Sequence, residues 1–345
     1  MGIAFNQIDD AVIATQQNFV KRGAFTDLQT DLQKHVLVRE LWKGRNKNAF
    51  VGGDPWEFEA QVDHNYSAKA VELFETDTSA FTDTLVKFEV NVKHINAFYL
   101  YDQREKAFQK GGKKIVDLIQ SRYVAMMVSV FEYLETVLWS IPESGDSKTP
   151  YGIGYWVTKS ASAGFNGVDH SNFSSGRAGV SSTDQPRWAN YTDRYVAISK
   201  EDLMRKMRKS AREIDFVSPV MHATPTWGKD RNGIYVNGDT LGSMEEELEK
   251  QNMNLGNDLA SKDGRVTFKS TPVTYAPKLN SYSDDPVFLL DWSTMVLGTL
   301  AGWENQLSQP YMVPGKSKVR RVDLDASLNM ICTNLRRQSV INTAG

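Results

Sequence analysis

The sequence predicts an α+β protein, and three observations lead to this prediction. Two long segments, 56–62 and 85–94, alternate apolar and polar residues with the period of two that half-buried strands show. A long helical pattern without Pro or Gly follows at 113–140. Beyond residue 188, short apolar runs typical of strands are mixed with two amphipathic helices. The chain therefore needs both helices and sheets.

Composition and charge exclude several function classes. The chain has 345 residues, 41% of them hydrophobic, which is enough for about two folded domains with a sizeable core. Its net charge of −2 provides no overall basic field for binding nucleic acid. The single cysteine, Cys332, excludes an intrachain disulfide. Since no apolar run suits a signal peptide or a membrane helix, we expect a soluble chain made in the cytoplasm, with no membrane partner.

The first fifty residues predict an N-terminal arm (1–50) with helical pieces. Apolar residues recur at helical spacing in two patches, at 8–19 and 28–36. Basic residues crowd the stretch 34–47 that precedes the segment VGGDP. A solvated helix face explains these charges, and the alternative is an arm that lies on an acidic partner surface.

The two alternating segments predict a β-hairpin, and a helix and a loop follow it. A two-stranded hairpin is marginal in water, so its apolar face needs a cover. The helix over 113–140 is bounded by Gly111 and Gly112 before it and by Pro142 after it. The stretch 141–188 is rich in Gly and Ser and has little periodicity, which indicates a functional or mobile loop.

The C-terminal half alternates helices and strands. Ser199 with Asp202, and Ser243 with Glu246, form two capping boxes that predict the starts of two helices. The predicted strands are a short one at 233–238, a pair around a turn at 270–272, a buried run at 287–292 and a long closing strand at 321–330.

No pattern of catalytic, cofactor-binding or metal-ligating residues is present, so we expect no enzyme. The five histidines are far apart; His64 and His94, which end the two hairpin strands, could be neighbours, but two ligands are too few for a metal. The segment VPGKSK resembles the end of a phosphate-binding loop, but Pro310 stands where the motif needs a glycine and a strand is expected after it. An enzyme would need a site in the segment 160–188, around Asp169 and His170.

The order of arm, hairpin, long helix, mixed domain and returning strand resembles the major capsid protein of tailed bacteriophages, a fold that encapsulin nanocompartments also use. The strands at 268–279, followed by a buried strand at 287–292 that ends near an aspartate, resemble the corresponding part of that family. The segment 328–341, with Arg336 and Arg337, resembles its closing strand.

This resemblance implies a domain organisation. An extended loop, the β-hairpin, occupies 51–100 and projects from the subunit. The spine helix and the peripheral domain occupy 101–150, and a mixed α/β axial domain at 151–305 points to the centre of a pentamer or hexamer. The chain returns to the peripheral domain at 306–345.

The resemblance also implies a function and partners. The chain is expected to be a structural head protein that self-assembles into pentamers and hexamers of an icosahedral shell and encloses double-stranded DNA without sequence-specific binding. It would be located in the virion, after assembly in the host cytoplasm. Because the hairpin begins near Trp56, we expect a separate scaffolding protein, with portal and decoration proteins as further partners. The alternatives are an encapsulin-like shell protein and an α/β enzyme with its site at 160–188.

In such a shell, a neighbouring copy would cover the apolar face of the hairpin. Replacing Phe88 and Val90 with Lys should then leave the isolated subunit folded while assembly fails. The residues predicted to make this inter-subunit contact are Trp56, Phe58, Val62, Val86, Phe88 and Val90.

Overall fold

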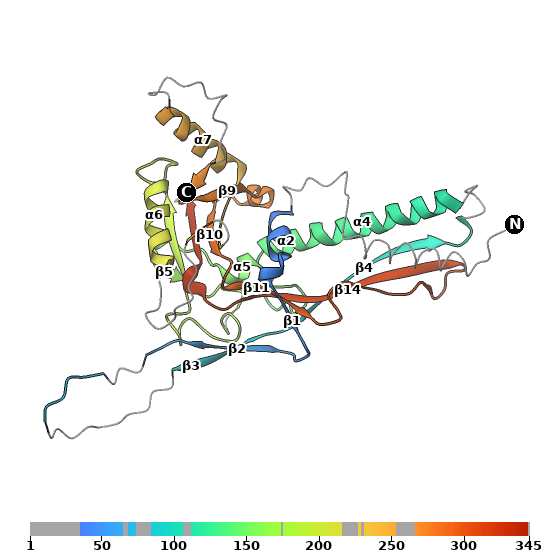
Figure 1. Cartoon of the computed structure of the whole chain (residues 1–345), viewed down its shortest axis with the longest axis horizontal. Coiled ribbons are helices and arrows are strands. Elements are labelled where there is room, and N and C mark those ends of the chain that lie inside the picture. Colours follow the sequence, from blue (N-terminus) through green and yellow to red (C-terminus); the bar gives the residue numbers. More distant parts are fainter. Residues whose placement is uncertain are drawn as a thin grey trace.

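The computed structural model shows an elongated molecule with one lobe at its side (Figure 1). The predicted helical patch at 8–19 lies outside the described part of the chain. The described residues are 35–64, 68–73, 84–105, 112–173, 175–215, 227–228, 231–252 and 266–343.

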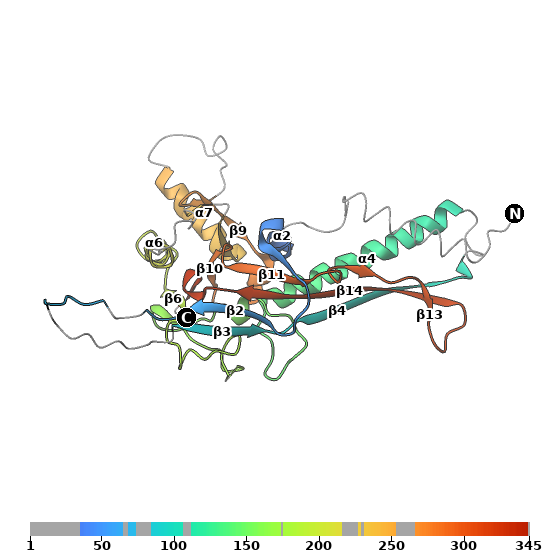
Figure 2. The ribbon, with the colours of Figure 1, turned by 60° about the horizontal axis from the view of Figure 1, so that its bottom comes forward.

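A six-stranded sheet and one long helix form the elongated part. Figure 2 shows helix α4 (Gly112–Trp139) lying along strands β4 (Lys93–Asp102) and β14 (Val319–Cys332). The two strands pair antiparallel from Val319 opposite Asp102 to Leu328 opposite Lys93. The other strands of this sheet are β1 (Lys47–Phe50), β11 (Met295–Leu300), β12 (Gln306–Leu307) and β13 (Tyr311–Met312).

A seven-stranded sheet forms the lobe, and helices α6 (Leu203–Ile214) and α7 (Gly238–Asn252) share one apolar cluster with it. At its other side, Trp139 at the end of α4 contacts Tyr235 and Phe288 with ring centroids 5.8 and 5.6 Å apart. The strand order is β5 (Gly164–Gly167), β6 (Asn190–Tyr195), β15 (Ser339–Thr343), β10 (Val287–Asp291), β7 (Asn232–Val236), β9 (Thr271–Tyr275) and β8 (Thr267–Phe268).

The hairpin forms its own two-stranded sheet. Strand β2 (Trp56–Gln61) pairs antiparallel with β3 (Leu85–Val90), so that Phe58 lies opposite Phe88. The remaining elements are helix α2 (Val36–Leu41), helix α5 (Ile153–Trp156) and the 3₁₀ helices η2 (Gly44–Asn46), η5 (Pro277–Ser281) and η6 (Leu335–Arg337).

Several predicted elements are confirmed. The helix predicted over 113–140 is α4, and the fully buried run is β10, all of whose residues are buried. The predicted strand pair is also present as β8 and β9, but its turn lies at Lys269 (φ 46°) and Ser270 (φ 65°) and not at 270–272, because Thr271 and Pro272 already belong to β9. The alternation at 321–330 is part of β14, whose apolar residues are buried.

Both predicted capping boxes place the helix starts wrongly. Helix α7 begins at Gly238, because the Oδ1 of Asn237 accepts the N–H of Thr240 (2.9 Å), so Ser243 lies inside the helix. Helix α6 begins at Leu203. The hydroxyl of Ser199 accepts the N–H of Asp202 (3.2 Å), which is one half of the predicted box. The other half is missing, because the carboxylate of Asp202 accepts the N–H groups of residues 196 and 197 and the N–H of Ser199 donates to the carbonyl of Ala197 (3.1 Å). Residues 200–202 therefore form a turn before the helix.

The two large sheets divide the chain at other places than the predicted boundaries. Strand β11 falls within the predicted unit 151–305 but pairs with β14 in the six-stranded sheet. Strand β15 falls within 306–345 but pairs with β10 and β6 in the seven-stranded sheet. The predicted strand at 85–94 is also interrupted, since β3 ends at Val90 and β4 begins at Lys93. The chain thus passes between the sheets more often than the sequence indicated.

Candidate inter-subunit contact

The base of the hairpin is anchored on its own chain. Phe88 and Val90 are 0% exposed and Trp56 is 3% exposed. The ring of Phe88 contacts that of Trp188 with centroids 4.2 Å apart, and Trp56 stacks on Phe50 at 4.6 Å. These contacts place the base of the hairpin in the main hydrophobic core.

A backbone contact and a glycine complete this anchor. The N–H of Glu89 donates to the carbonyl of Ala178 (3.0 Å), which ties β3 to the segment before Trp188. Gly298 on β11 faces the indole of Trp56, and a Cβ at this glycine would lie 2.6 Å from the ring. Only a residue without a side chain lets Trp56 pack this closely on β11. No sequence pattern indicates this contact, because residues 56 and 298 are far apart in the chain.

The predicted contact residues therefore fall into two groups. The expectation that Phe88 and Val90 lie outside the subunit core is wrong, because both are buried in the main hydrophobic cluster, where Phe88 packs on Trp188 of the same chain. Trp56 is covered in the same way. Phe58, Val62 and Val86 are half-buried and keep some surface for another molecule. An inter-subunit contact through these three residues stays a prediction.

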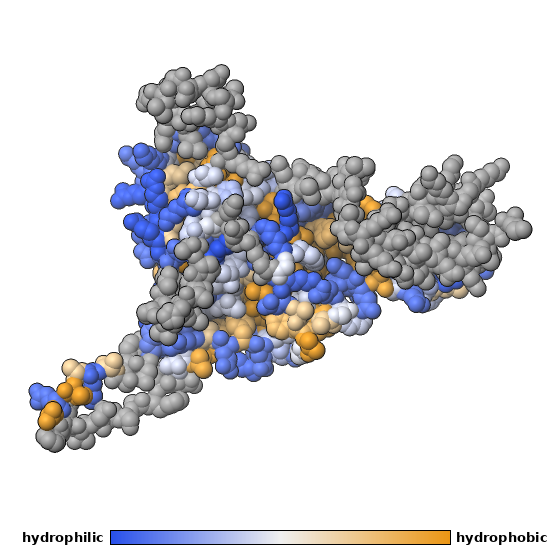
Figure 3. Space-filling view, viewed as in Figure 1, coloured by the Kyte–Doolittle hydropathy of each residue, from blue (hydrophilic) through white to orange (hydrophobic). Residues whose placement is uncertain are grey.

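The distal part of the hairpin exposes large apolar side chains. Val71 is 62% exposed and Leu73 is 87% exposed, and Leu85, at the start of β3, is 53% exposed. Figure 3 shows apolar and polar side chains side by side at this projecting end, at the lower left. We call Val71, Leu73 and Leu85 the distal apolar residues. These three side chains are available for a contact with another molecule.

The outward face of the hairpin is polar. The Nζ of Lys87 lies 2.6 Å from an Oε of Glu57 on the paired strand and 3.5 Å from one of Glu89. The hydrogen bond with Glu57 raises the pKa of Lys87. Because this pair is exposed, it adds little to the stability of the hairpin.

A second anchor holds the part of the arm that the structure describes. Glu135 on α4 is buried, and its two carboxylate oxygens accept the N–H groups of Leu37 (3.1 Å) and Val38 (3.0 Å) at the start of α2. The indole N–H of Trp139 donates to the same carboxylate (2.9 Å). Burial raises the pKa of Glu135, while these three hydrogen bonds oppose the shift.

The Gly- and Ser-rich stretch is organised around Arg177, which is fully buried. An ion pair joins its Nε to Oδ1 of Asp169 (3.3 Å), whose other oxygen accepts from the N–H and the hydroxyl of Ser182 (2.6 and 2.8 Å). Burial lowers the pKa of Arg177, and Asp169 opposes the shift. The guanidinium also donates to the carbonyl oxygens of Trp156 (2.7 Å), Gly167 (2.7 Å) and Trp188 (2.9 Å) and to Oδ1 of Asn190 (3.2 Å).

These contacts weigh against a catalytic site at 160–188. The carboxylate of Asp169 is occupied by Arg177 and Ser182, and the Nδ1 of His170 accepts the N–H of Asn172 (3.2 Å) within a local turn. Both side chains thus serve the local structure of the stretch, and among the described residues no hydrogen bond joins them to each other, as a base and its orienting carboxylate would need. The sequence did not single out Arg177, because a lone arginine in a loop carries no pattern.

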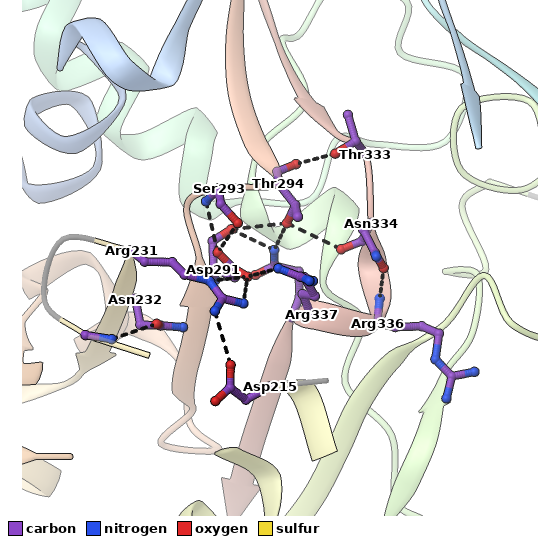
Figure 4. Close-up of polar contacts among 12 residues, drawn as sticks. Asp215, Arg231, Asn232, Asp291, Ser293, Thr294, Thr333, Asn334, Arg336 and Arg337 are labelled. Atoms are coloured by element: carbon purple, nitrogen blue, oxygen red, sulfur yellow. Dashed lines mark hydrogen bonds and ion pairs between the residues drawn. The ribbon is translucent and has the colours of Figure 1, made fainter. Parts of the chain in front are cut away.

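A buried charged cluster joins the two large sheets (Figure 4). Asp291 ends β10, is 1% exposed, and its Oδ2 accepts from the Nε (3.0 Å) and a terminal nitrogen (2.7 Å) of Arg231. Arg337 reaches the same oxygen at 3.4 Å, and the hydroxyl of Ser293 donates to Oδ1 (2.6 Å). Asp215, after α6, accepts from Arg231 as well (3.1 Å). The cluster therefore fixes the corner between β10 and β11, where the chain leaves one sheet for the other.

The structure does not assemble the other sites that the sequence suggested, a histidine pair and a phosphate-binding loop. The antiparallel register puts His64 beyond the Gln61 end of the hairpin and His94 beyond the Trp56 end, so the two are not neighbours. No group of three or more His, Cys, Asp or Glu side chains that could hold a metal occurs among the described residues. VPGKSK forms the turn between β13 and β14, and a strand follows it as predicted.

In the described part of the chain, no helix is both long and apolar enough to cross a membrane.

Comparison with known proteins identifies the fold. No family model and no curated protein matches the sequence. Among solved structures, a chain of the cyanophage A-1(L) capsid asymmetric unit aligns over 92% of this chain and 95% of its own, with 13% identity and a TM-score of 0.57. The holo-SrpI encapsulin complex from Synechococcus elongatus PCC 7942 aligns over 96% and 94%, with 11% identity and a TM-score of 0.53. The chain thus has the α+β fold of phage capsid proteins and encapsulins, which confirms the fold predicted from the order of elements.

Proposed function

We propose that this chain is a structural shell protein, the major capsid protein of a bacteriophage head. Copies would assemble into pentamers and hexamers of an icosahedral shell around double-stranded DNA. The observation that carries the proposal is the likeness to a phage capsid chain over more than nine-tenths of both chains. In this reading α4 is the spine helix, the six-stranded sheet belongs to the peripheral domain and the seven-stranded sheet to the axial domain.

The geometry of the hairpin supports self-assembly. Its base is fixed rigidly in the core, whereas its distal apolar residues, Val71, Leu73 and Leu85, are more than half exposed. Anchoring the base of the hairpin lowers the entropy that is lost when a partner binds these side chains, which favours binding. A neighbouring copy that buries them, together with the half-buried Phe58, Val62 and Val86, is the partner we propose.

The proposed function is structural rather than enzymatic. Three of the buried charged groups, Glu135, Arg177 and Asp291, each hold two or more segments together by hydrogen bonds. Their role is to fix the subunit in one shape, which an ordered shell requires.

Electron microscopy of the purified protein tests the proposal. We expect closed shells, or rings with five-fold and six-fold symmetry, at high protein concentration. A protein that remains a monomer by analytical ultracentrifugation under the same conditions would contradict self-assembly. A scaffolding protein is a proposed partner, so the experiment should be repeated with the neighbouring genes co-expressed before a monomer is accepted as the result.

An encapsulin-like compartment is the second candidate, since the SrpI encapsulin complex shares the fold at a similar TM-score. The two functions differ in the content of the shell. Particles isolated from the cells or virions that naturally contain the chain should protect double-stranded DNA from nuclease if it is a phage head. Protein cargo without protected DNA would instead indicate a compartment. Portal and decoration proteins, location in the virion and assembly in the host cytoplasm belong to the first proposal only.

A further inference from the structure

Helix α6 carries a line of basic side chains on its exposed face. Within Leu203–Ile214 there are five basic residues and one acidic residue. Leu203, Met207 and Ala211 are buried against the sheet. Lys206 pairs with Asp202 (2.6 Å). We call the other four basic residues, all exposed, the basic stripe: Arg205, Arg208, Lys209 and Arg212.

The basic stripe is unfavourable for the isolated subunit. Arg205 and Lys209 are four residues apart, as are Arg208 and Arg212, so like charges adjoin on one helix face, which destabilises a helix. None of the four forms an ion pair with another described residue. A helix face of this kind gains stability when an anionic partner covers it.

Helix α7 carries the opposite charge. Gly238–Asn252 contains five acidic residues and one basic residue. Met244 is buried against the sheet, while Glu245 and Glu246 are exposed and form no ion pair with the described residues. We call Glu245 and Glu246 the acidic face. Their adjacent negative charges repel each other as those of the basic stripe do.

The two charged surfaces lie at opposite ends of one sheet. Helix α6 packs on β6 and β15, near the β5 edge, whereas α7 packs on β9, near the β8 edge. Both helices belong to the same apolar cluster, so both lie on the same face of the sheet. Figure 1 shows them at two separate borders of the lobe, and Figure 3 shows hydrophilic side chains along the border that α6 forms.

We propose that the basic stripe of one copy contacts the acidic face of the next copy in a ring. This inference rests on the self-assembly proposed above and names two of its contacting surfaces. A contact between two different surfaces of identical chains is heterologous, and it generates a closed ring when the rotation between copies closes. Opposite charges at the two edges also set direction and register, because a reversed copy would bring like charges together.

A second copy fits these charges better than nucleic acid does. A phosphate backbone would match the basic stripe, but the acidic face would then lie on the same lobe without a partner and would repel the backbone. A second copy neutralises both surfaces with one contact. The chain as a whole is close to neutral, with a net charge of −2, so these charges are segregated rather than in excess.

Charge reversal on each helix, followed by their combination, tests the contact. Arg205→Glu with Lys209→Glu reverses the stripe, and Glu245→Lys with Glu246→Lys reverses the acidic face. Each double variant should lower the fraction of protein in rings or shells about tenfold or more, because like charges across an interface cost several kcal/mol. The quadruple variant, which exchanges the two signs, should restore assembly. Electron microscopy and sedimentation velocity give the assembled fraction, and circular dichroism shows that each variant folds.

The control and the remaining outcomes separate the explanations. Lys148→Glu with Lys316→Glu makes the same charge change at two exposed lysines away from both helices and should assemble like the parent. Normal assembly of both reversed variants would overturn the proposed contact and leave the proposed function intact. A quadruple variant that does not recover assembly would also overturn the contact. An α6 variant that forms normal shells with less enclosed DNA would overturn it too, because the basic stripe would then bind DNA and not a second copy. A parent protein that never assembles would remove the proposed function itself.

Discussion

The base and the distal part of the hairpin are two stretches of one ribbon with opposite environments. At the base, Phe88 and Val90 are 0% exposed and pack on their own chain. Further along, Val71 is 62% exposed and Leu73 87% exposed. Both stretches mix large apolar with charged side chains, so the sequence pattern alone does not say whether an apolar side chain contributes to the stability of the subunit or to a contact with another molecule.

The contacts at the base hold one end of the hairpin in place before assembly. Fixing a flexible hairpin costs conformational entropy at the moment of binding. In this chain the aromatic contacts of Trp56 and Phe88 fix the base during folding of the subunit. Substitutions at the base should therefore change the free energy of unfolding, whereas substitutions of the distal residues should change assembly.

Phe88→Ala should have the largest effect on subunit stability. It removes the ring that contacts both Phe58 and Trp188, at centroid distances of 5.1 and 4.2 Å, from a fully buried position. We expect a loss of about 3–5 kcal/mol in the free energy of unfolding, measured by urea denaturation of the unassembled subunit. Leu85→Ala, on the same strand but 53% exposed, is the matched control and should change stability by about 0.5 kcal/mol or less. Equal effects of the two variants would mean that the base is no better anchored than the distal part.

Gly298→Ala should have the next largest effect. The new methyl group would lie 2.6 Å from the indole of Trp56, so the ring or the strand must shift. Overpacking of this kind costs about 1–3 kcal/mol in the free energy of unfolding. Gly242→Ala in α7 is the control, because nothing lies within 4 Å of its added Cβ. A Gly298→Ala subunit as stable as the Gly242→Ala subunit would show that Trp56 is not held against β11.

The sequence could predict those elements whose signal is local. The helix α4 follows from its periodicity and from flanking Gly and Pro, β10 follows from an apolar run, and β14 follows from alternation. The alternation of β2 and β3 predicts which side chains share a face of the hairpin. What covers its apolar face depends on Gly298 and on Trp188, which lie far away in the chain, and no spacing rule reports such contacts.

The helix starts and the buried charges were not predicted because each depends on a residue or backbone group that the short sequence motif does not contain. Ser243 with Glu246 matches a capping box, but Asn237 provides a cap one and a half turns earlier and the helix extends back to it. Arg177 and Glu135 look like ordinary surface charges in the sequence. Their burial becomes evident only when the carbonyl and N–H groups that they bind are assembled around them.

The contacts of Glu135, which anchor the arm, predict that the stability of the subunit depends on pH. Burial holds the pKa of Glu135 above its ordinary value of 4.5. Its contribution to stability is therefore fully present below pH 4.5 and is lost as the pH rises through the folded-state pKa. Gln at this position does not ionise, so the stability of the parent relative to Glu135→Gln should fall as the pH is raised from 4.5. Urea denaturation of both proteins across this range measures the difference, and a constant or rising difference would contradict the argument.

Leu73→Lys should have the smallest effect on the subunit and a large effect on assembly. Leu73 is 87% exposed, so a charge at this position costs the isolated chain little, about 0.5 kcal/mol or less. In a shell that buries Leu73 against a neighbour, the same charge would be desolvated without a partner, which is strongly unfavourable. Leu73→Met keeps the apolar character and should assemble like the parent. Electron microscopy and urea denaturation of the two variants measure both effects. If Leu73→Lys assembles normally, the distal part of the hairpin is not a contact, and self-assembly would have to depend on the lobe, where the charges of α6 and α7 lie.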